Sequence, residues 1–217
     1  MIGNSGILKV KKHLGITVFV LIALLGSALY WNAYVNYRFE EISEDRVYKS
    51  ALIPPEKLES FLIPNNIKTV INLIDPGVQD ALNPGEMQHI IKEDEAIRQI
   101  NEKLGTDIRH VSIPSDQVPS KTTLSRFFEV LDDENSYPVL VHCYHGTGRA
   151  VIYSAIYRVE YEDWESEAAR METRAHPVLV DSPLYQSSFA AGREKGDFLI
   201  QYVPRNESDS TLDQLSE

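Results

Sequence analysis

The sequence has little cysteine and little positive charge, and each shortage excludes a class of protein. Its 217 residues contain one cysteine, Cys143. The chain therefore cannot form an internal disulfide or a zinc site built from cysteines alone, and we expect neither a metal nor a cofactor. Lys and Arg number 21 against 32 Asp and Glu, which gives a formal net charge of −11. Because non-specific binding to DNA or RNA relies on basic side chains, no nucleic-acid partner is expected.

Charged side chains are also missing from one long segment, between Leu14 and Tyr37. The segment is apolar around every face of a helix as far as Trp31, and about 20 such residues cross a bilayer. Aromatic residues close its far end, where they favour the membrane–water interface. We therefore expect a basic N-terminal segment over residues 1–13 and a single transmembrane anchor over residues 14–36.

The flanks of this anchor predict its orientation. Three lysines lie within residues 9–12, whereas Arg38 alone follows the anchor closely. This asymmetry favours an N-terminus in the cytoplasm and a following domain outside it, although counting as far as Lys49 evens the tally. Two alternatives stay open: a signal peptide cleaved near Gly26-Ser27-Ala28, and a buried core helix.

The remainder of the chain alternates between strand and helix patterns. Predicted strands cover residues 68–74, 108–113 and 138–142, and predicted helices cover 86–104, 124–131, 150–161, 165–174 and 183–191. Alternation of this kind predicts an α/β domain, with a central mixed sheet flanked by helices, over residues 44–203. The acidic tail over residues 204–217 is expected to be disordered.

Cys143 directly follows the buried strand over residues 138–142 and precedes a predicted helix. The connecting loop reads His142-Cys143-Tyr144-His145-Gly146-Thr147-Gly148-Arg149. Its two glycines let the backbone curl so that successive N–H groups form an anion nest, next to the positive end of the helix. Arg149 can clamp two phosphate oxygens. These surroundings favour the thiolate, the nucleophilic form of Cys143, and predict phosphate binding by Tyr144, His145, Gly146, Thr147, Gly148 and Arg149.

The loop resembles the signature of the protein tyrosine phosphatase superfamily: His-Cys, five residues, Arg, then usually Ser or Thr. Its two glycines look most like the dual-specificity branch, and Arg46–Leu52 and Ile67–Leu73 resemble the first strands of small bacterial members. The resemblance implies a dual-specificity-type phosphatase in which Cys143 takes the phosphoryl group and water then hydrolyses the phosphocysteine. It also implies that His142 supports the loop.

Such an enzyme needs an acid to protonate the leaving alcohol. In the family this acid is an Asp on a loop upstream of the cysteine. Asp116, within Ser115–Pro119, matches that place and chain order, so Asp116 is our candidate. A loop Asp also commonly bonds its own backbone, and Asp75, Asp132 and Asp133 are weaker competitors.

Ala150 departs from the family pattern, because the residue after the Arg usually carries a hydroxyl that bonds the departing thiolate. Its absence predicts slow hydrolysis of the phosphocysteine. It also keeps a phosphate-binding pseudophosphatase open as an alternative. A rhodanese-type sulfurtransferase is a further one, since it too places a loop cysteine between strand and helix.

The substrate is expected to be a phosphorylated protein or a small phosphate ester. The loop has no Lys or Arg before Arg149, which favours phosphoproteins, with phosphotyrosine first. A phosphoinositide or inositol phosphate phosphatase stays open as the alternative, because His145 can be protonated and the anchor would place the site near lipid headgroups.

Overall fold

The computed structural model describes residues 4–77 and 85–206. The chain divides into two compact units, Met1–Phe39 and Glu40–Glu217, which are described separately. Most of the tail predicted to be disordered, residues 207–217, lies outside the described residues.

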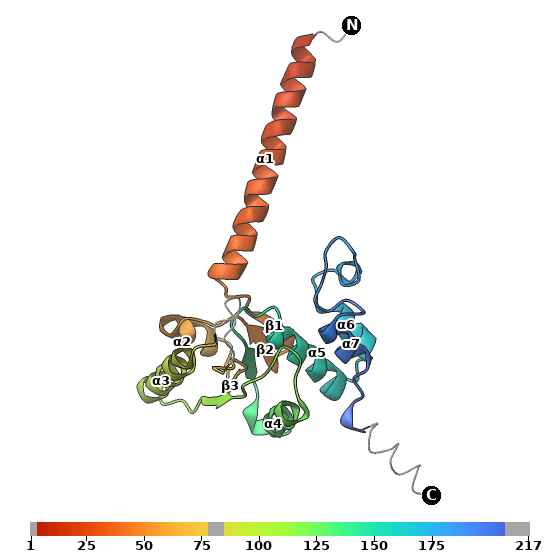
Figure 1. Cartoon of the computed structure of the whole chain (residues 1–217). Helices are drawn as coiled ribbons and strands as arrows, with labels where there is room; N and C mark the ends of the chain where they lie inside the picture. The colour runs from red at the N-terminus through yellow and green to blue at the C-terminus, as the bar shows by residue number, and fades with distance from the viewer. Residues whose placement is uncertain (1–3, 78–84, 207–217) are drawn as a thin grey trace, which may run out of the picture. The chain divides into compact units, whose positions relative to one another are not determined.

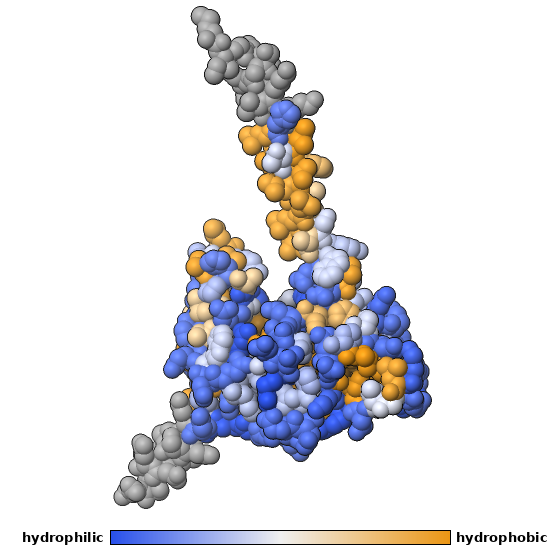
Figure 2. All heavy atoms as spheres, turned by 180° about the vertical axis from the view of Figure 1, so that it is seen from behind, coloured by the Kyte–Doolittle hydropathy of each residue, from blue (hydrophilic) through white to orange (hydrophobic). Residues whose placement is uncertain are grey.

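The first unit contains one long helix, α1 (Asn4–Tyr34), which begins before the predicted anchor. Within the described residues, only its stretch His13–Tyr34 is long and apolar enough to cross a membrane, with a mean hydropathy of 2.1. None of that stretch is buried, and Figure 2 shows its apolar side chains on the surface. The helix therefore does not have the burial of a soluble core helix, and its length and composition suit either an anchor or a signal sequence.

The second unit is built on a five-stranded sheet (Figure 1). Its order is β1-β2-β5-β3-β4, with bounds β1 Glu40–Ser43, β2 Val47–Ser50, β3 Thr69–Asn72, β4 Arg109–Ser112 and β5 Val139–His142. Strand β1 runs antiparallel to β2, whereas β2, β5, β3 and β4 are mutually parallel. The predicted mixed sheet is confirmed. Because β1 pairs with β2, the unit begins at Glu40, before the predicted boundary at Glu44.

Helices cover both faces of the sheet, as the continuous apolar runs of β3 and β5 require. Their bounds are α2 Leu58–Leu62, α3 Met87–Leu104, α4 Lys121–Leu131, α5 Arg149–Tyr161, α6 Ser166–Met171 and α7 Glu194–Ile200, with short 3₁₀ turns at Pro55–Lys57, Glu134–Ser136 and Pro177–Leu179. Helices α2 and α3 lie on one side and α4 and α5 on the other (Figure 1). This confirms the α/β class.

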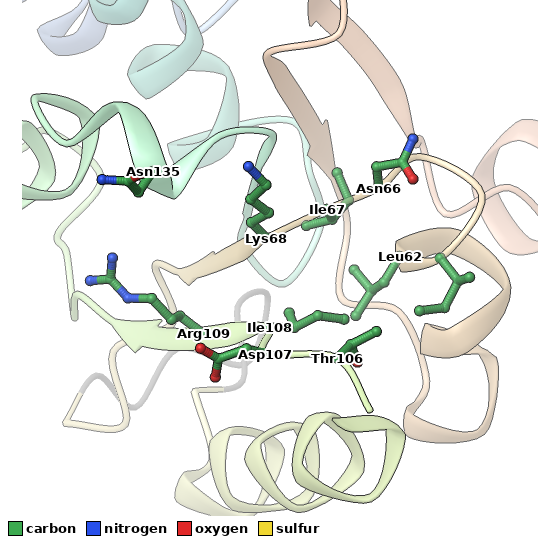
Figure 3. A pocket seen from close by; sticks show the side chains of 10 residues that line it. Leu62, Asn66, Ile67, Lys68, Thr106, Asp107, Ile108, Arg109 and Asn135 are labelled. Carbon is green, nitrogen blue, oxygen red and sulfur yellow. The ribbon is translucent and has the colours of Figure 1, made fainter. Parts of the chain in front are cut away.

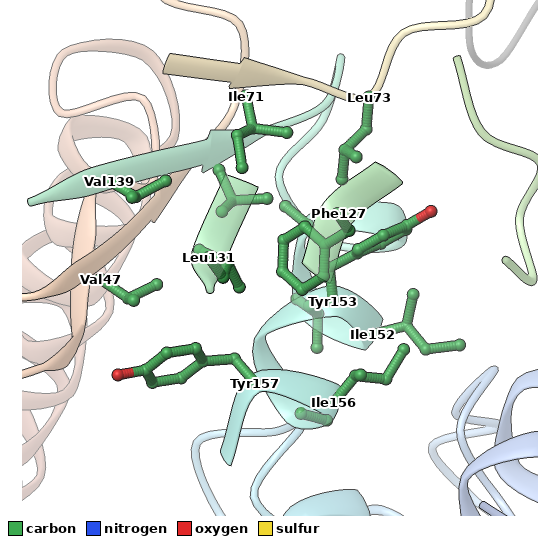
Figure 4. Close-up of a cluster of buried hydrophobic side chains, with 14 of the residues drawn as sticks. Val47, Ile71, Leu73, Phe127, Leu131, Val139, Ile152, Tyr153, Ile156 and Tyr157 are labelled. Carbon is green, nitrogen blue, oxygen red and sulfur yellow. The ribbon is translucent and has the colours of Figure 1, made fainter. Parts of the chain in front are cut away.

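The core on the α5 side fixes both ends of the cysteine loop. Val139 of β5 and Ile71 of β3 pack with Phe127 of α4 and Ile152 of α5 (Figure 4). The rings of Phe127 and Tyr153 meet edge to face, with centroids 4.8 Å apart. Because β5 and α5 are held in one cluster of close-packed side chains, the loop that joins them starts and ends on rigid supports.

The predicted helix over residues 183–191 is wrong. The amides of Tyr185 and Gln186 both bond the carbonyl of Ser182, which makes a single turn. The backbone then enters the left-handed region at Gln186, with φ of 50°, and no helix continues. Leu184 is 95% exposed and Tyr185 is 51% exposed, so Phe189 is the one large apolar side chain that the segment buries, which is too little to stabilise a helix. Three elements went unpredicted: β1, α2 and α7.

Candidate active site

The cysteine loop joins the end of β5 to the first residue of α5. Cys143 directly follows β5 and is 3% exposed. The backbone amide of Gly146 donates a hydrogen bond to its Sγ at 3.3 Å. The sulfur therefore faces a backbone N–H donor inside the loop.

Gly146 is the position where the loop requires glycine. Its φ is +67°, and a Cβ there would lie 2.5 Å from the backbone nitrogen of Ala51 and 2.7 Å from the carbonyl carbon of Ser50. The chain leaving β2 therefore passes directly against the loop, and the amide of Leu52 also donates to the carbonyl of Tyr144 at 3.1 Å. Only glycine combines this conformation with this close approach.

Arg149 is oriented by two backbone carbonyls. It is 4% exposed, and its Nη1 donates to the carbonyl oxygens of Leu73 at 2.7 Å and Ser115 at 3.2 Å. Leu73 follows β3 and Ser115 lies just beyond β4, so the carboxyl ends of two parallel strands hold the guanidinium. These two bonds fix Nη1 of the Arg149 guanidinium. The other N–H groups of the guanidinium are left to bind an oxyanion.

The segment that carries Asp116 is fastened to the same place. Ser115 is buried, and its Oγ accepts a hydrogen bond from the Tyr153 hydroxyl at 2.9 Å. On the other side, Oε1 of Gln117 lies 3.1 Å from the position a Cβ on Gly148 would take. Asp116 is exposed between these two anchored neighbours. The structure thus places the segment that carries Asp116 at the end of the cysteine loop.

The competing aspartates have structural partners elsewhere. Asp132 pairs with Arg205 at 2.9 Å, and Asp133 accepts from the amide of Asn135 at 3.0 Å. Asp75 accepts from the amide of Gly77 at 2.8 Å, as in an Asx turn. Each of these three carboxylates bonds a turn amide or forms an ion pair. The segment that carries Asp116 is instead held beside Arg149, through the carbonyl of Ser115.

His142 contacts a buried carboxylate that the sequence reasoning missed. Oε2 of Glu93, in α3, lies 3.0 Å from Nε2 of His142 and 2.9 Å from Nε2 of His110. It also accepts from Nδ2 of Asn72 at 2.6 Å. Burial alone would raise the pKa of Glu93, but these partners outweigh it and lower the pKa to about 2. A signal was available, because Glu93 shares one helical face with the buried Ile97 and Ile100.

Two further basic side chains, Lys195 and Arg174, come from the C-terminal part of the chain, and Lys195 reaches the cysteine loop. Nζ of Lys195, in α7, lies 3.0 Å from the Cβ position of Gly148 and donates to Gln117 Oε1 at 2.5 Å. Burial lowers the pKa of Lys195; attraction to Cys143 opposes this, and repulsion by Arg149 and Arg174 adds to it. Sequence reasoning found neither cation, since nothing local marks a residue whose role depends on how α7 packs.

The remaining loop residues differ in exposure. His145 and Thr147 are exposed at the mouth of the loop, whereas Tyr144 is half-buried. The Tyr144 ring lies 5.6 Å from the ring of His89 and 4.8 Å from that of His145. Aromatic and imidazole rings therefore lie along one part of the loop, whereas the cations Lys195 and Arg149 lie at its end.

A separate pocket of about 540 Å³ lies at the opposite edge of the sheet (Figure 3). Ile67, Lys68, Ile108 and Arg109 line it, just before or at the start of β3 and β4. It includes no residue of the cysteine loop, which lies beyond the carboxyl ends of the strands. In a parallel sheet that carboxyl edge is the usual place for a ligand.

Comparisons with known proteins agree with this geometry. The family model described as "Polymorphic toxin system, DSP-PTPase phosphatase" matches residues 48–161, more than half of the chain. The dual specificity protein phosphatase TpbA of Pseudomonas aeruginosa strain UCBPP-PA14 is 36% identical over 67 residues, which is 30% of this chain and 31% of TpbA. The chain thus matches less than a third of that relative's length.

Two solved structures share the fold. The catalytic core of the PP-IP phosphatase SIW14 from S. cerevisiae superposes with a TM-score of 0.52 at 14% identity, over 82% of this chain and 92% of that one. P. aeruginosa TpbA gives a TM-score of 0.50 at 20% identity, over 76% and 84% of the two chains. On the family match, the chain belongs to the DSP-PTPase phosphatase family, and its fold is the one seen in these two phosphatase structures.

Proposed function

We propose that the protein hydrolyses phosphomonoesters through a phosphocysteine intermediate, with Cys143 as the nucleophile. The observation that carries this proposal is the Gly146 amide, which donates to the buried Cys143 sulfur at 3.3 Å. The loop that holds this sulfur ends on Arg149, whose guanidinium is already oriented by the carbonyls of Leu73 and Ser115. A thiolate and an oriented guanidinium at the two ends of one loop suit attack on a bound phosphoryl group.

The first step transfers the phosphoryl group. The Cys143 thiolate attacks phosphorus, the bond to the leaving oxygen breaks, and Asp116 gives that oxygen its proton. Loop amides and Arg149 stabilise the charge on the three remaining oxygens. In the second step water attacks the phosphocysteine and passes a proton to the Asp116 carboxylate. The sulfur leaves as a thiolate together with inorganic phosphate, and the protein returns to its starting state.

A phosphotyrosyl or dual-specificity protein substrate is our first proposal for the finer function. It is supported by the absence of basic residues between Cys143 and Arg149 and by the partial match to TpbA, a dual specificity protein phosphatase. A phosphoinositide or inositol phosphate is the second candidate. The presence of Lys195 beside Gly148 favours it, because that ammonium supplies the extra positive charge that the loop lacks.

The test uses the full chain in detergent micelles with para-nitrophenyl phosphate. We expect turnover that is abolished in Cys143→Ser, and a phosphorylated cysteine detectable by rapid acid quench and mass spectrometry. A pseudophosphatase would bind phosphate without turnover in the unmodified chain. A sulfurtransferase would instead move sulfur from thiosulfate to cyanide, and either result would sink the proposal.

We further propose that α1 anchors the protein with its N-terminus in the cytoplasm and the phosphatase unit on the other side. The support is the length and hydropathy of His13–Tyr34 and the lysines before it. An alkaline phosphatase reporter fused to the C-terminus, active only outside the cytoplasm, tests the orientation. N-terminal sequencing of the membrane-bound protein separates an uncleaved anchor from a signal peptide removed near Ala28.

A further inference from the structure

Two cations share one buried aromatic ring beside the cysteine loop. Nζ of Lys195 lies 5.6 Å from the centroid of Phe189, and Cζ of Arg174 lies 5.1 Å from the same centroid. Phe189 is fully buried. Lys195 extends to Gly148, so this pair of cations begins at the edge of the phosphate loop and continues away from it. Cation–π contact with Phe189 helps to hold both groups in place.

Neither cation has a carboxylate partner among the described residues. The hydrogen bonds found there are from Lys195 to the neutral amide of Gln117 and from Arg174 to the carbonyl of Thr173. Nε of Arg174 is buried without a hydrogen-bond partner. Glu194 attracts Lys195 through space without forming an ion pair with it. Burial lowers the pKa of both basic groups, which is the expected sign for cations removed from water without compensation.

Two other basic side chains of the C-terminal part of the chain are neutralised by carboxylates. Arg170, four positions before Arg174, bonds Glu167 at 2.6 Å and Asp181 at 2.7 Å. Arg205 likewise bonds Asp132 and Glu160, each at 2.9 Å. The missing carboxylates at Lys195 and Arg174 are therefore a local feature. Two neighbouring positive charges without counter-charges destabilise the folded protein, and a bound anion would offset that cost.

We propose that Lys195 and Arg174 form a subsite for a second phosphate group of the substrate, next to the phosphate bound by the Cys143 loop. The inference rests on the proposed phosphatase function and names its substrate class: esters that carry at least two phosphates. A guanidinium fork and an ammonium together supply the N–H donors and the positive charge that bind a phosphate dianion. The class includes soluble inositol phosphates and phosphorylated inositol lipid headgroups, which share this chemistry.

The test compares substrates with one and several phosphates on the full chain in detergent micelles. The probes are para-nitrophenyl phosphate, a soluble myo-inositol trisphosphate, and phosphatidylinositol bisphosphate within the micelles. We expect Lys195→Met and Arg174→Met each to lower kcat/KM for the multi-phosphate probes about tenfold or more. Arg174→Met should change turnover of para-nitrophenyl phosphate less than about twofold, because this ester has nothing to place in the subsite, and Lys195→Met should lower that turnover much less than it lowers turnover of the multi-phosphate probes. Loss on the soluble probe alone, or on the lipid alone, identifies the source of the headgroup.

Matched variants keep the result interpretable. Lys103→Met removes an exposed lysine at the far edge of the sheet, paired with Glu59, and should change none of the rates. Lys195→Arg should recover most of the loss if charge is what matters. Binding of myo-inositol trisphosphate to Cys143→Ser, with and without Lys195→Met, measures the subsite without turnover and so separates its failure from failure of the phosphatase proposal. Equal losses on all three probes, or unchanged rates on both multi-phosphate probes, would overturn the subsite.

Discussion

Oε2 of Glu93 lies 3.0 Å from Nε2 of His142, although the two residues are 49 positions apart in the chain. Both side chains are about 2% exposed. His142 immediately precedes the nucleophile, so this contact ties the start of the cysteine loop to α3. The same carboxylate oxygen accepts from Asn72, whose neighbour Leu73 holds Arg149. One buried carboxylate thus connects the strand ends that support both ends of the loop.

Replacing Glu93 should therefore reduce both stability and catalysis. We expect Glu93→Ala to lower the free energy of unfolding by about 3–5 kcal/mol, since it strands buried polar partners. Glu93→Gln keeps the shape and should cost less, roughly 1–3 kcal/mol. Urea denaturation measures the loss, and kcat of the folded variant reports the loop. The neighbouring Glu95→Gln, on the exposed face of α3, is the control and should leave both unchanged. Full activity in folded Glu93→Gln would show that the contact is not needed for the loop.

The Glu93 cluster also predicts how stability depends on pH. The pKa of Glu93 is lowered from 4.5 to about 2. The stability that its carboxylate contributes is therefore fully present above pH 4.5 and is lost as the pH falls toward 2. Burial would lower the pKa of His110, but bonds to Glu93 and Asp94 raise it above 6.5. The stability that protonated His110 contributes is therefore fully present below pH 6.5 and is lost as the pH rises through its raised pKa. Urea midpoints across this range should fall at both ends, and His110→Gln should flatten the alkaline side. An unchanged alkaline slope in that variant would contradict the assignment to His110.

Gly146 and Gly105 make a matched pair for testing the loop backbone. Both have φ of +67°, but a Cβ on Gly105 meets nothing within 4 Å, whereas one on Gly146 collides with the backbone of Ser50 and Ala51. We expect Gly105→Ala to cost about 1 kcal/mol with normal kinetics. Gly146→Ala should cost roughly 2–4 kcal/mol and abolish most activity. Thermal denaturation and kcat/KM measure the two effects, and equal costs at the two positions would show that conformation alone, not close approach, selects glycine.

The part of the site that was predictable from sequence is contiguous in the chain. Residues His142 to Arg149 join a buried strand to a helix, so spacing and two glycines were sufficient to indicate an anion-binding loop. The alternation of apolar runs likewise predicted β3, β4 and β5 and the helices between them, because each run carries its own burial pattern.

The rest depends on tertiary packing. Lys195 looks like a solvent-exposed charge until α7 is placed against the loop, and the helical face that Glu93 shares with Ile97 indicates burial without identifying its partners. The segment over residues 183–191 had a good capping residue in Ser182, but local capping cannot replace a missing buried face, and Leu184 points to solvent. Strand β1 has the exposed pattern of an edge and only becomes a strand by pairing with β2.

Asp116 is expected to act as the acid, and leaving-group dependence is the readout. Asp116→Asn should lower kcat for an alkyl phosphate by about 10²–10⁴-fold, because an alkoxide leaves poorly without a proton. The loss on para-nitrophenyl phosphate should be smaller, since its phenolate leaves without help. Asp133→Asn is the matched control, because that carboxylate bonds Asn135 and Arg109 and no residue of the cysteine loop. A uniform loss over both esters would assign Asp116 to binding instead.

Ala150 makes a prediction about the second step. It is fully buried directly after Arg149, in the same core cluster as Cys143. If no hydroxyl stabilises the departing thiolate, phosphocysteine should accumulate, and stopped-flow traces with para-nitrophenyl phosphate should show a burst followed by slow turnover. Ala150→Ser adds a buried hydroxyl that needs an acceptor, and the thiolate is one. We therefore expect faster steady-state turnover with an unchanged burst rate.

The control for Ala150→Ser is Ala155→Ser, the same change at another buried position of α5. A serine there can bond a carbonyl of the preceding turn, as Ser154 bonds Ala150, so it should alter stability slightly and kinetics not at all. Identical traces for Ala150→Ser and the unmodified protein would show that the missing hydroxyl does not limit turnover.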